Sequence, residues 1–156
     1  AHSGGVWESP HVGGDRFAAN MVAFPHGLVF GRVEPELGAE VVGAYAQGRI
    51  VLDHYRGRTS HPVHVQAAEI AVRRREGVDR IDDVRLIDAH RVGDLATARF
   101  ASPGAESLVR LARRRLPPMR LTCGSSSDEA AVTWVAESIE THPAAPFDQR
   151  DASSSP

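Results

Sequence analysis

A glycine loop near the N-terminus carries the residues best suited to chemistry. It runs PHVGGD over residues 10–15, and Arg16 follows it. Adjacent glycines let backbone N–H groups approach an anion at a helix N-terminus, where Arg16 would clamp it. Asp15 favours the other interpretation, because a carboxylate there repels phosphate but caps a helix well. The loop thus suggests either an anion site or a capped helical turn over 16–20, and we expect the cap.

Three other groups of residues are of types that could carry chemistry. His61 and His64 form an H-x-x-H pair at a helix start, but no third ligand lies nearby, so solvated histidines are expected. The only cysteine, Cys123, is expected to be a small buried or ordinary free thiol rather than a redox thiol activated by Arg120. The arginines at 113–115 form either a docking patch for an electron-transfer partner or, as we expect, a solvated face.

Hydrolase chemistry finds little support. A glycosidase needs two facing carboxylates in a pocket with aromatic platforms, whereas no acidic pair stands out and aromatic residues make up 6% of the chain. The serine run at 125–127 lacks the flanking glycine of a nucleophile elbow.

The elements that must position the loop follow from apolar periodicity. We expect a strand at 6–9, and a hairpin from apolar runs at 21–24 and 28–33 joined by Pro-His-Gly. Near-continuous apolarity predicts a sheet covered on both faces. A helix follows from about 34 to Gly48, with its apolar positions at 37, 41, 42 and 45.

The second half changes its period. After a link over 49–60, a helix is expected over 62–76, ended by three arginines and Gly77. Strands are then expected at 84–87, 95–100, 108–116, 119–123 and 132–139. The third of these also fits a helix, but the Ser-Pro-Gly turn before it favours a strand. A disordered tail is expected over 141–156.

Composition sets the remaining bounds. The chain has 156 residues, 42% apolar and 24% charged, with a formal net charge of −2. This balance predicts a globular protein without a nucleic-acid partner, and no run is long enough to suggest a membrane span or leader, so a cytoplasmic location is the default expectation. All 18 basic residues are arginine. We attribute this to genomic base composition, since an oxyanion-binding surface would need clustering in space that a sequence cannot show.

Three segments carry a resemblance to a known family. They are WESPHVGGDRFAAN at 7–20, FPHGLVFGRV at 24–33 and AQGR at 46–49. In order, spacing and identity they resemble the sucrase/ferredoxin-like family over about residues 6–75, whereas the later strands resemble it only loosely. The resemblance implies a thioredoxin-like [2Fe–2S] ferredoxin in which the hairpin and the last helix complete the domain.

The same resemblance implies a ligand set. Relatives hold the cluster with two cysteines from an earlier segment and two histidines spaced H-x-x-x-H. His11 matches the first histidine, but Asp15 stands at the second, and the cysteine-bearing strand and helix do not precede Val6. The implied cofactor-binding residues are His11, as the metal ligand, with Gly13, Gly14, Asp15 and Arg16 around it. Glycine N–H groups there could hydrogen-bond the cluster sulfides and tune the potential.

The expected fold class is therefore α/β. Residues 1–57 would form the second half of a thioredoxin-like ferredoxin unit, and 58–140 a helix plus a β-rich extension. The leading hypothesis is a ferredoxin-like electron carrier with an unidentified redox partner, whose [2Fe–2S] cluster is incomplete in this chain. The alternative is a cluster-free binding or scaffold module, with the sheet and arginines against a partner protein. A third is a small-molecule-binding enzyme using the glycine loop. A missing first strand and helix would also leave a sheet edge open to a homodimer.

Overall fold

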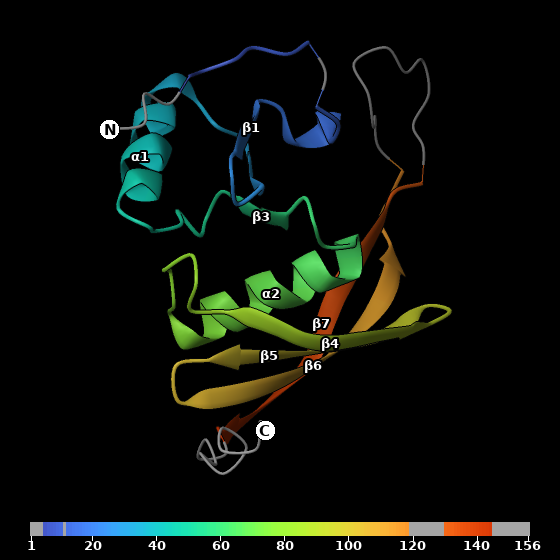
Figure 1. Cartoon of the computed structure of the whole chain (residues 1–156). Helices are drawn as coiled ribbons and strands as arrows, with labels where there is room; N and C mark the ends of the chain where they lie inside the picture. The colour runs from blue at the N-terminus through green and yellow to red at the C-terminus, as the bar shows by residue number, and fades with distance from the viewer. Residues whose placement is uncertain (1–4, 11, 119–129, 145–156) are drawn as a thin grey trace, which may run out of the picture.

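The computed structural model describes residues 5–10, 12–118 and 130–144. It is a mixed α/β fold of two antiparallel sheets and two helices (Figure 1). The first sheet has the order β1-β2-β3 and the second the order β4-β5-β6-β7. Among the described residues, neither helix is long and apolar enough to cross a membrane. The expected α/β class is confirmed at this level.

The predicted hairpin is confirmed. β1 (Asn20–Ala23) pairs antiparallel with β2 (Leu28–Gly31). The central strand β2 is almost wholly buried, whereas the edge strand β1 is half-buried throughout. The other edge, β3 (Tyr55–Arg58), lies inside the stretch expected to be a link. Its short Tyr-Arg-Gly-Arg sequence carries too little apolar signal to announce a strand.

The segment before the hairpin differs from expectation in two ways. The predicted strand at 6–9 is wrong, since those residues are irregular and the side chains of Val6 and Trp7 are 95% and 92% exposed. The predicted helical turns shrink to a 3-10 turn, η1 (Asp15–Phe17). Its N-cap is Gly14, in the left-handed region, so the prediction that Asp15 caps a helix is also wrong.

Both predicted helices are present. α1 is Pro35–Ala46 and α2 is Val63–Glu76, the latter ending at Gly77 with φ 68° as expected. Val42, one of the apolar positions expected in the first helix, is instead 54% exposed.

Strands expected in the second half of the chain form the second sheet. Its strands are β4 (Arg85–Val92), β5 (Leu95–Ser102), β6 (Ala105–Arg115) and β7 (Val132–Pro143). The segment that also fitted a helix is therefore a strand. The predicted strand at 119–123, with Cys123, lies outside the described residues, and so does most of the predicted tail.

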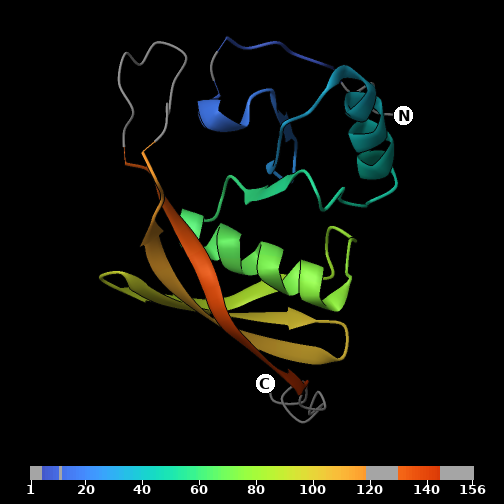
Figure 2. The same ribbon diagram turned by 180° about the vertical axis from the view of Figure 1, so that it is seen from behind.

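Helix α2 lies between the two sheets (Figures 1 and 2). Val65, Ala68 and Val72 on one side join a core with β5 and β6. Ile70 packs against the second core, which contains Phe30 of β2 and Tyr55 of β3. Helix α2 therefore connects the second sheet with β3, the strand that was not predicted from the sequence.

Candidate functional site

The side chain of Asn20 holds the glycine loop in place through two hydrogen bonds. Gly13 and Gly14 have φ values of 79° and 73°, a region that side-chain-bearing residues rarely enter. The Nδ2 group of Asn20 donates to the carbonyl oxygens of Gly13 and Gly14, at 2.9 and 3.1 Å. These hydrogen bonds help to position Asp15 and Arg16, which follow the loop directly. His11, the implied metal ligand, lies outside the described residues.

The ring of Phe17 is the centre of a group of arginines. The guanidinium carbon of Arg56 lies 3.5 Å from the ring centroid, that of Arg16 4.6 Å, and that of Arg32 5.9 Å. These cations come from β3, from η1 and from the residue after β2. Three segments far apart in the sequence thus converge on one half-buried aromatic side chain, as cation–π attraction favours.

Close backbone contact fixes η1 against β2. A Cβ built on Gly31 would lie 2.9 Å from the Cβ of Phe17 and 3.1 Å from its carbonyl oxygen, so no larger residue fits without movement. Arg32 has φ 57°, and its N–H donates to the Phe17 carbonyl at 2.6 Å. The backbone of Arg32 is therefore held in the left-handed region by the contact that also places Phe17.

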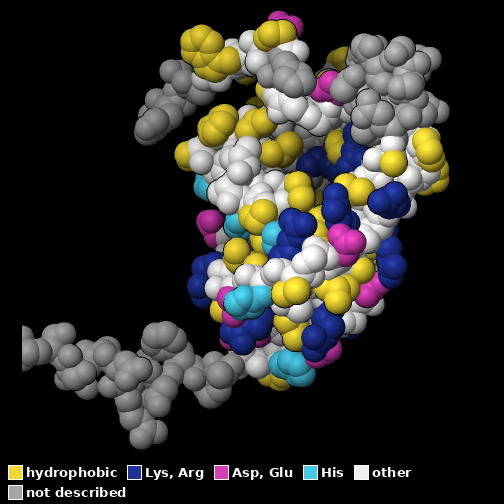
Figure 3. Space-filling model, turned by 90° about the vertical axis from the view of Figure 1, so that its right-hand side faces the viewer, with side chains coloured by type: hydrophobic (Ala, Val, Ile, Leu, Met, Phe, Trp, Pro, Cys, Tyr) yellow, Lys and Arg dark blue, Asp and Glu magenta, His cyan; other side chains and the backbone are white. Residues whose placement is uncertain are grey.

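The electrostatics of this group are unbalanced. Burial lowers the pKa of Arg56, and the charges of Arg16, Arg32 and Arg74 of α2 lower it further. In the part of the chain that the structure describes, none of these four takes part in an ion pair. We call Arg16, Arg32, Arg56 and Arg74, with Phe17 among them, the arginine cluster. Basic side chains gather on the face seen in Figure 3, which is the side of Figure 1 where η1 lies.

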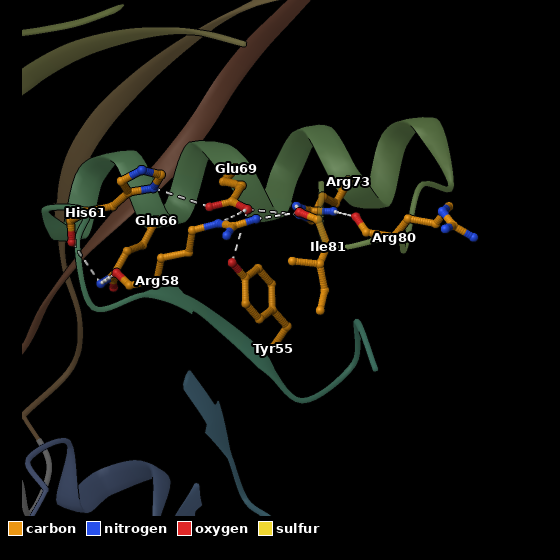
Figure 4. Close-up of polar contacts among 8 residues, drawn as sticks. All are labelled: Tyr55, Arg58, His61, Gln66, Glu69, Arg73, Arg80 and Ile81. Carbon is orange, nitrogen blue, oxygen red and sulfur yellow. Dashed lines mark hydrogen bonds and ion pairs between the residues drawn. The ribbon is translucent and has the colours of Figure 1, made fainter. Parts of the chain in front are cut away.

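A second charged group lies inside the protein and has a different character. Glu69 of α2 is fully buried, and its Oε1 accepts hydrogen bonds from the Tyr55 hydroxyl at 3.0 Å and from Nε of Arg73 at 2.9 Å (Figure 4). Nε of Arg58 lies 3.3 Å from the same oxygen. Both guanidinium groups also donate to the carbonyl of Ile81. In this network two guanidinium groups share one carboxylate and one carbonyl oxygen, and their contacts join β3 to α2.

The fourth contact of Glu69 is with a histidine. Nδ1 of His61 lies 3.3 Å from Oε2 of Glu69, the distance of an ion pair without the geometry of a hydrogen bond. Burial alone would raise the pKa of Glu69, but His61, Arg73 and Arg58 outweigh it and lower the pKa to about 2. Burial and the Glu69 charge together raise the pKa of Tyr55. Glu69 is therefore an anion that stays ionised, which suits a structural tie.

The other nominated residues do not assemble into a site. His61 faces Glu69, whereas the His64 ring lies 5.5 Å from that of Trp134, so the two histidines have different neighbours. Arg113 and Arg114 pair with Asp94 and Glu137 on the surface. Among the described residues, no three His, Cys, Asp or Glu side chains are grouped to hold a metal.

The donor set of a [2Fe–2S] cluster does not fit this chain by itself. Such clusters take four ligands, with at least two thiolates, and the sequence supplies one cysteine. Cys123 and His11 both lie outside the described residues. A cluster would need thiolates from another polypeptide segment.

Comparison with known proteins yields no relative: no protein-family model, no curated protein and no solved structure matches the chain. The likeness to the sucrase/ferredoxin-like family stays a prediction from the motifs.

Sequence reasoning found one member of the arginine cluster and missed the rest. Arg16 was nominated as a clamp beside Gly13 and Gly14, and the structure places it next to them as their order requires. Phe17, Arg32, Arg56 and Arg74 were not nominated. The exclusive use of arginine was the one available signal, but only the tertiary fold shows which arginines meet.

Proposed function

We propose that this protein is a binding module whose arginine cluster receives an anionic ligand. The observation that carries the proposal is the convergence of Arg16, Arg32 and Arg56 on Phe17, with Arg74 close enough to add its charge. This is a specific form of the alternative that the sequence suggests, a binding module without an iron–sulfur cluster.

Physical chemistry supports this function. Like charges in one place destabilise the fold unless a counter-charge arrives, and none of the described ion pairs supplies it. Guanidinium groups present several N–H donors in a fixed fork that matches oxyanions. Their positions are set by a strand, a tight turn and a helix, so an anion would meet donors that are already arranged.

Titration of the full chain with anions at constant ionic strength tests the proposal. Sulfate, inorganic phosphate and citrate are added with chloride as the balancing salt, and unfolding temperature and heat of binding are recorded. A multivalent anion should raise the unfolding temperature in a saturable way, and Arg56→Gln should weaken that binding at least tenfold.

Arg110→Gln is the matched control, because Arg110 is an exposed arginine on β6 that pairs with Glu140 away from Phe17. It should bind anions as the wild type does. Equal loss in both variants would show a non-specific charge effect and refute the site.

Electron transfer in a completed domain is a second proposal. It is supported by the β1–β2 hairpin and α1, which follow the glycine loop in the order that the family resemblance implies. The thioredoxin-like ancestry of the first sheet, the redox partner and pairing of two chains through the β1 edge belong to the same proposal. Anaerobically purified protein would show visible absorption with equimolar iron and sulfide if a cluster is held. A colourless, iron-free sample would contradict the electron-transfer proposal for this chain, and anion binding would be the one proposal left.

A further inference from the structure

We infer that the ligand of the arginine cluster is a doubly charged phosphoryl group carried by a small molecule. This inference rests on the proposed function and narrows it from anions in general to one chemical class. Three properties of the cluster support it: its charge, its donors and its rigidity.

The charge of the cluster calls for more than a monoanion. Arg56 lies within reach of three other positive charges, since Arg16, Arg32 and Arg74 all lower its pKa after burial does. Asp15 of η1 brings one formal negative charge next to Arg16, so about three positive charges remain, and one carboxylate or chloride would leave most of them unbalanced. A phosphoryl group carries a charge of about −1.5 to −2 at pH 7 and presents three strong acceptor oxygens.

The donors of the cluster are suited to a tetrahedral anion. At 3.5 Å from the centroid, the guanidinium of Arg56 is in van der Waals contact with the ring of Phe17, so it lies roughly parallel to that ring. Its flat face is used by the stacking contact, whereas its N–H groups project from its edge. Arg16 and Arg32 approach the same ring from other segments. Guanidinium groups supplied by three separate segments can offer donors to the three oxygens of a tetrahedral group, whereas a carboxylate has only two coplanar oxygens.

The cluster is also anchored. Gly31 and Phe17 are in close backbone contact, and the N–H of Arg32 donates to Phe17. On the other side, Tyr55 and Arg58 flank Arg56 in β3 and are tied to Glu69. The cluster therefore loses little further conformational entropy when a small ligand binds, and this favours affinity for a compact group.

The experiment measures affinity against pH for four ligands by calorimetry on the full chain. Phenyl phosphate has a second ionisation near pH 6, so its dianion fraction rises about tenfold between pH 5 and pH 7. Its affinity should rise about tenfold over that interval. The affinity for inorganic phosphate should also rise. The affinity for sulfate should stay within about twofold because the charge of sulfate is constant over this interval, and acetate should not bind.

The sulfate arm also controls for groups of the protein that titrate. Near the cluster these include Asp15 of η1 and His54, whose Nδ1 lies 3.2 Å from the carbonyl oxygen of Gly31. A change common to sulfate and phenyl phosphate would come from such groups. The inference concerns the difference between the two ligands.

The outcomes separate the inference from the proposed function. Sulfate and phenyl phosphate binding equally at every pH would overturn the phosphoryl inference and leave an anion site. No saturable binding by any ligand would overturn both. Tighter binding of phenyl phosphate than of inorganic phosphate supports an esterified ligand, and the reverse order supports the free ion.

Variants tie the pH effect to the cluster. Arg56→Lys keeps the charge but loses the planar fork and the stacking on Phe17, so it should weaken the binding of both phenyl phosphate and sulfate. Arg110→Gln should leave the affinity for both ligands unchanged. Circular dichroism of each variant confirms that it folds. Wild-type affinity in a folded Arg56→Lys protein would overturn the assignment of Arg56 as a donor to the ligand.

Discussion

The guanidinium of Arg56 lies 3.5 Å from the centroid of the Phe17 ring, although 38 residues of sequence separate them. The ring offers an electron-rich face to a cation that is otherwise surrounded by like charges. Phe17 thus does for the arginines what a carboxylate does in the buried network around Glu69. The difference is that an aromatic face leaves the positive charge in place for a ligand.

Replacing Phe17 tests this role of the ring. Phe17→Leu keeps an apolar side chain but removes the quadrupole, so the arginines should separate. We expect the free energy of unfolding in urea to fall by about 1–2 kcal/mol and sulfate affinity to fall severalfold. Trp7→Leu is the control, because Trp7 is 92% exposed, and it should change the stability by less than about 0.5 kcal/mol. Unchanged affinity in Phe17→Leu would show that the ring does not organise the site.

Gly31 offers a second test through the backbone. In Gly31→Ala the new Cβ meets the Cβ of Phe17 at 2.9 Å, so η1 must move away from β2. We expect a loss of about 1–3 kcal/mol of unfolding free energy and weaker anion binding.

Gly43→Ala gives the opposite sign and serves as the control. Gly43 lies inside α1, and a Cβ there meets nothing within 4 Å. The substitution should stabilise the protein by about 0.5–1 kcal/mol and leave anion binding unchanged. Destabilisation by Gly43→Ala and none by Gly31→Ala would contradict the packing described for η1.

The sequence predicted those helices and strands that are marked by nearby residues, such as apolar runs, a helical period or a glycine at a turn. The hairpin followed from two apolar runs around Gly27, and α2 from its period and from Gly77, which takes the left-handed conformation. Most strands of the second sheet followed from alternation. The predicted strand at 6–9 failed because an apolar run forms a strand only when another strand pairs with it, and none does so here.

The candidate site could not be predicted in the same way. β3 has four residues, of which two are arginines, and it becomes a strand by pairing with β2. That pairing brings Arg56 to Phe17, so the meeting of the two depends on long-range contacts. The burial of Glu69 was not predicted either, because it depends on three neighbours with polar hydrogens that come from the tertiary fold.

The buried network should matter for stability far more than surface ion pairs do. Glu69→Gln leaves Arg58 and Arg73 without their counter-charge in the interior, so we expect a loss of about 3–5 kcal/mol in the free energy of unfolding. Glu137→Gln removes the partner of Arg114 on the surface and should cost less than about 1 kcal/mol. Urea denaturation of both variants makes the comparison. Similar small losses in the two would show that Glu69 is not held as an ion.

Acid should remove the contribution of Glu69 within a defined pH range. Its pKa is about 2 in the folded protein, against 4.5 as the ordinary value, because His61, Arg73 and Arg58 outweigh the effect of burial. The unfolded chain therefore binds this proton first as the pH falls. The stabilisation is complete above about pH 5 and is lost progressively towards pH 2, by up to about 3 kcal/mol.

Unfolding free energy measured in urea from pH 7 to pH 2 checks this for the wild type and Glu69→Gln. The difference between the two proteins should be constant above about pH 5 and shrink below it, since the variant has no carboxylate to protonate at this position. Parallel curves down to pH 2 would mean that Glu69 protonates equally in both states. The contacts with Arg58 and Arg73 would then not favour its ionised form.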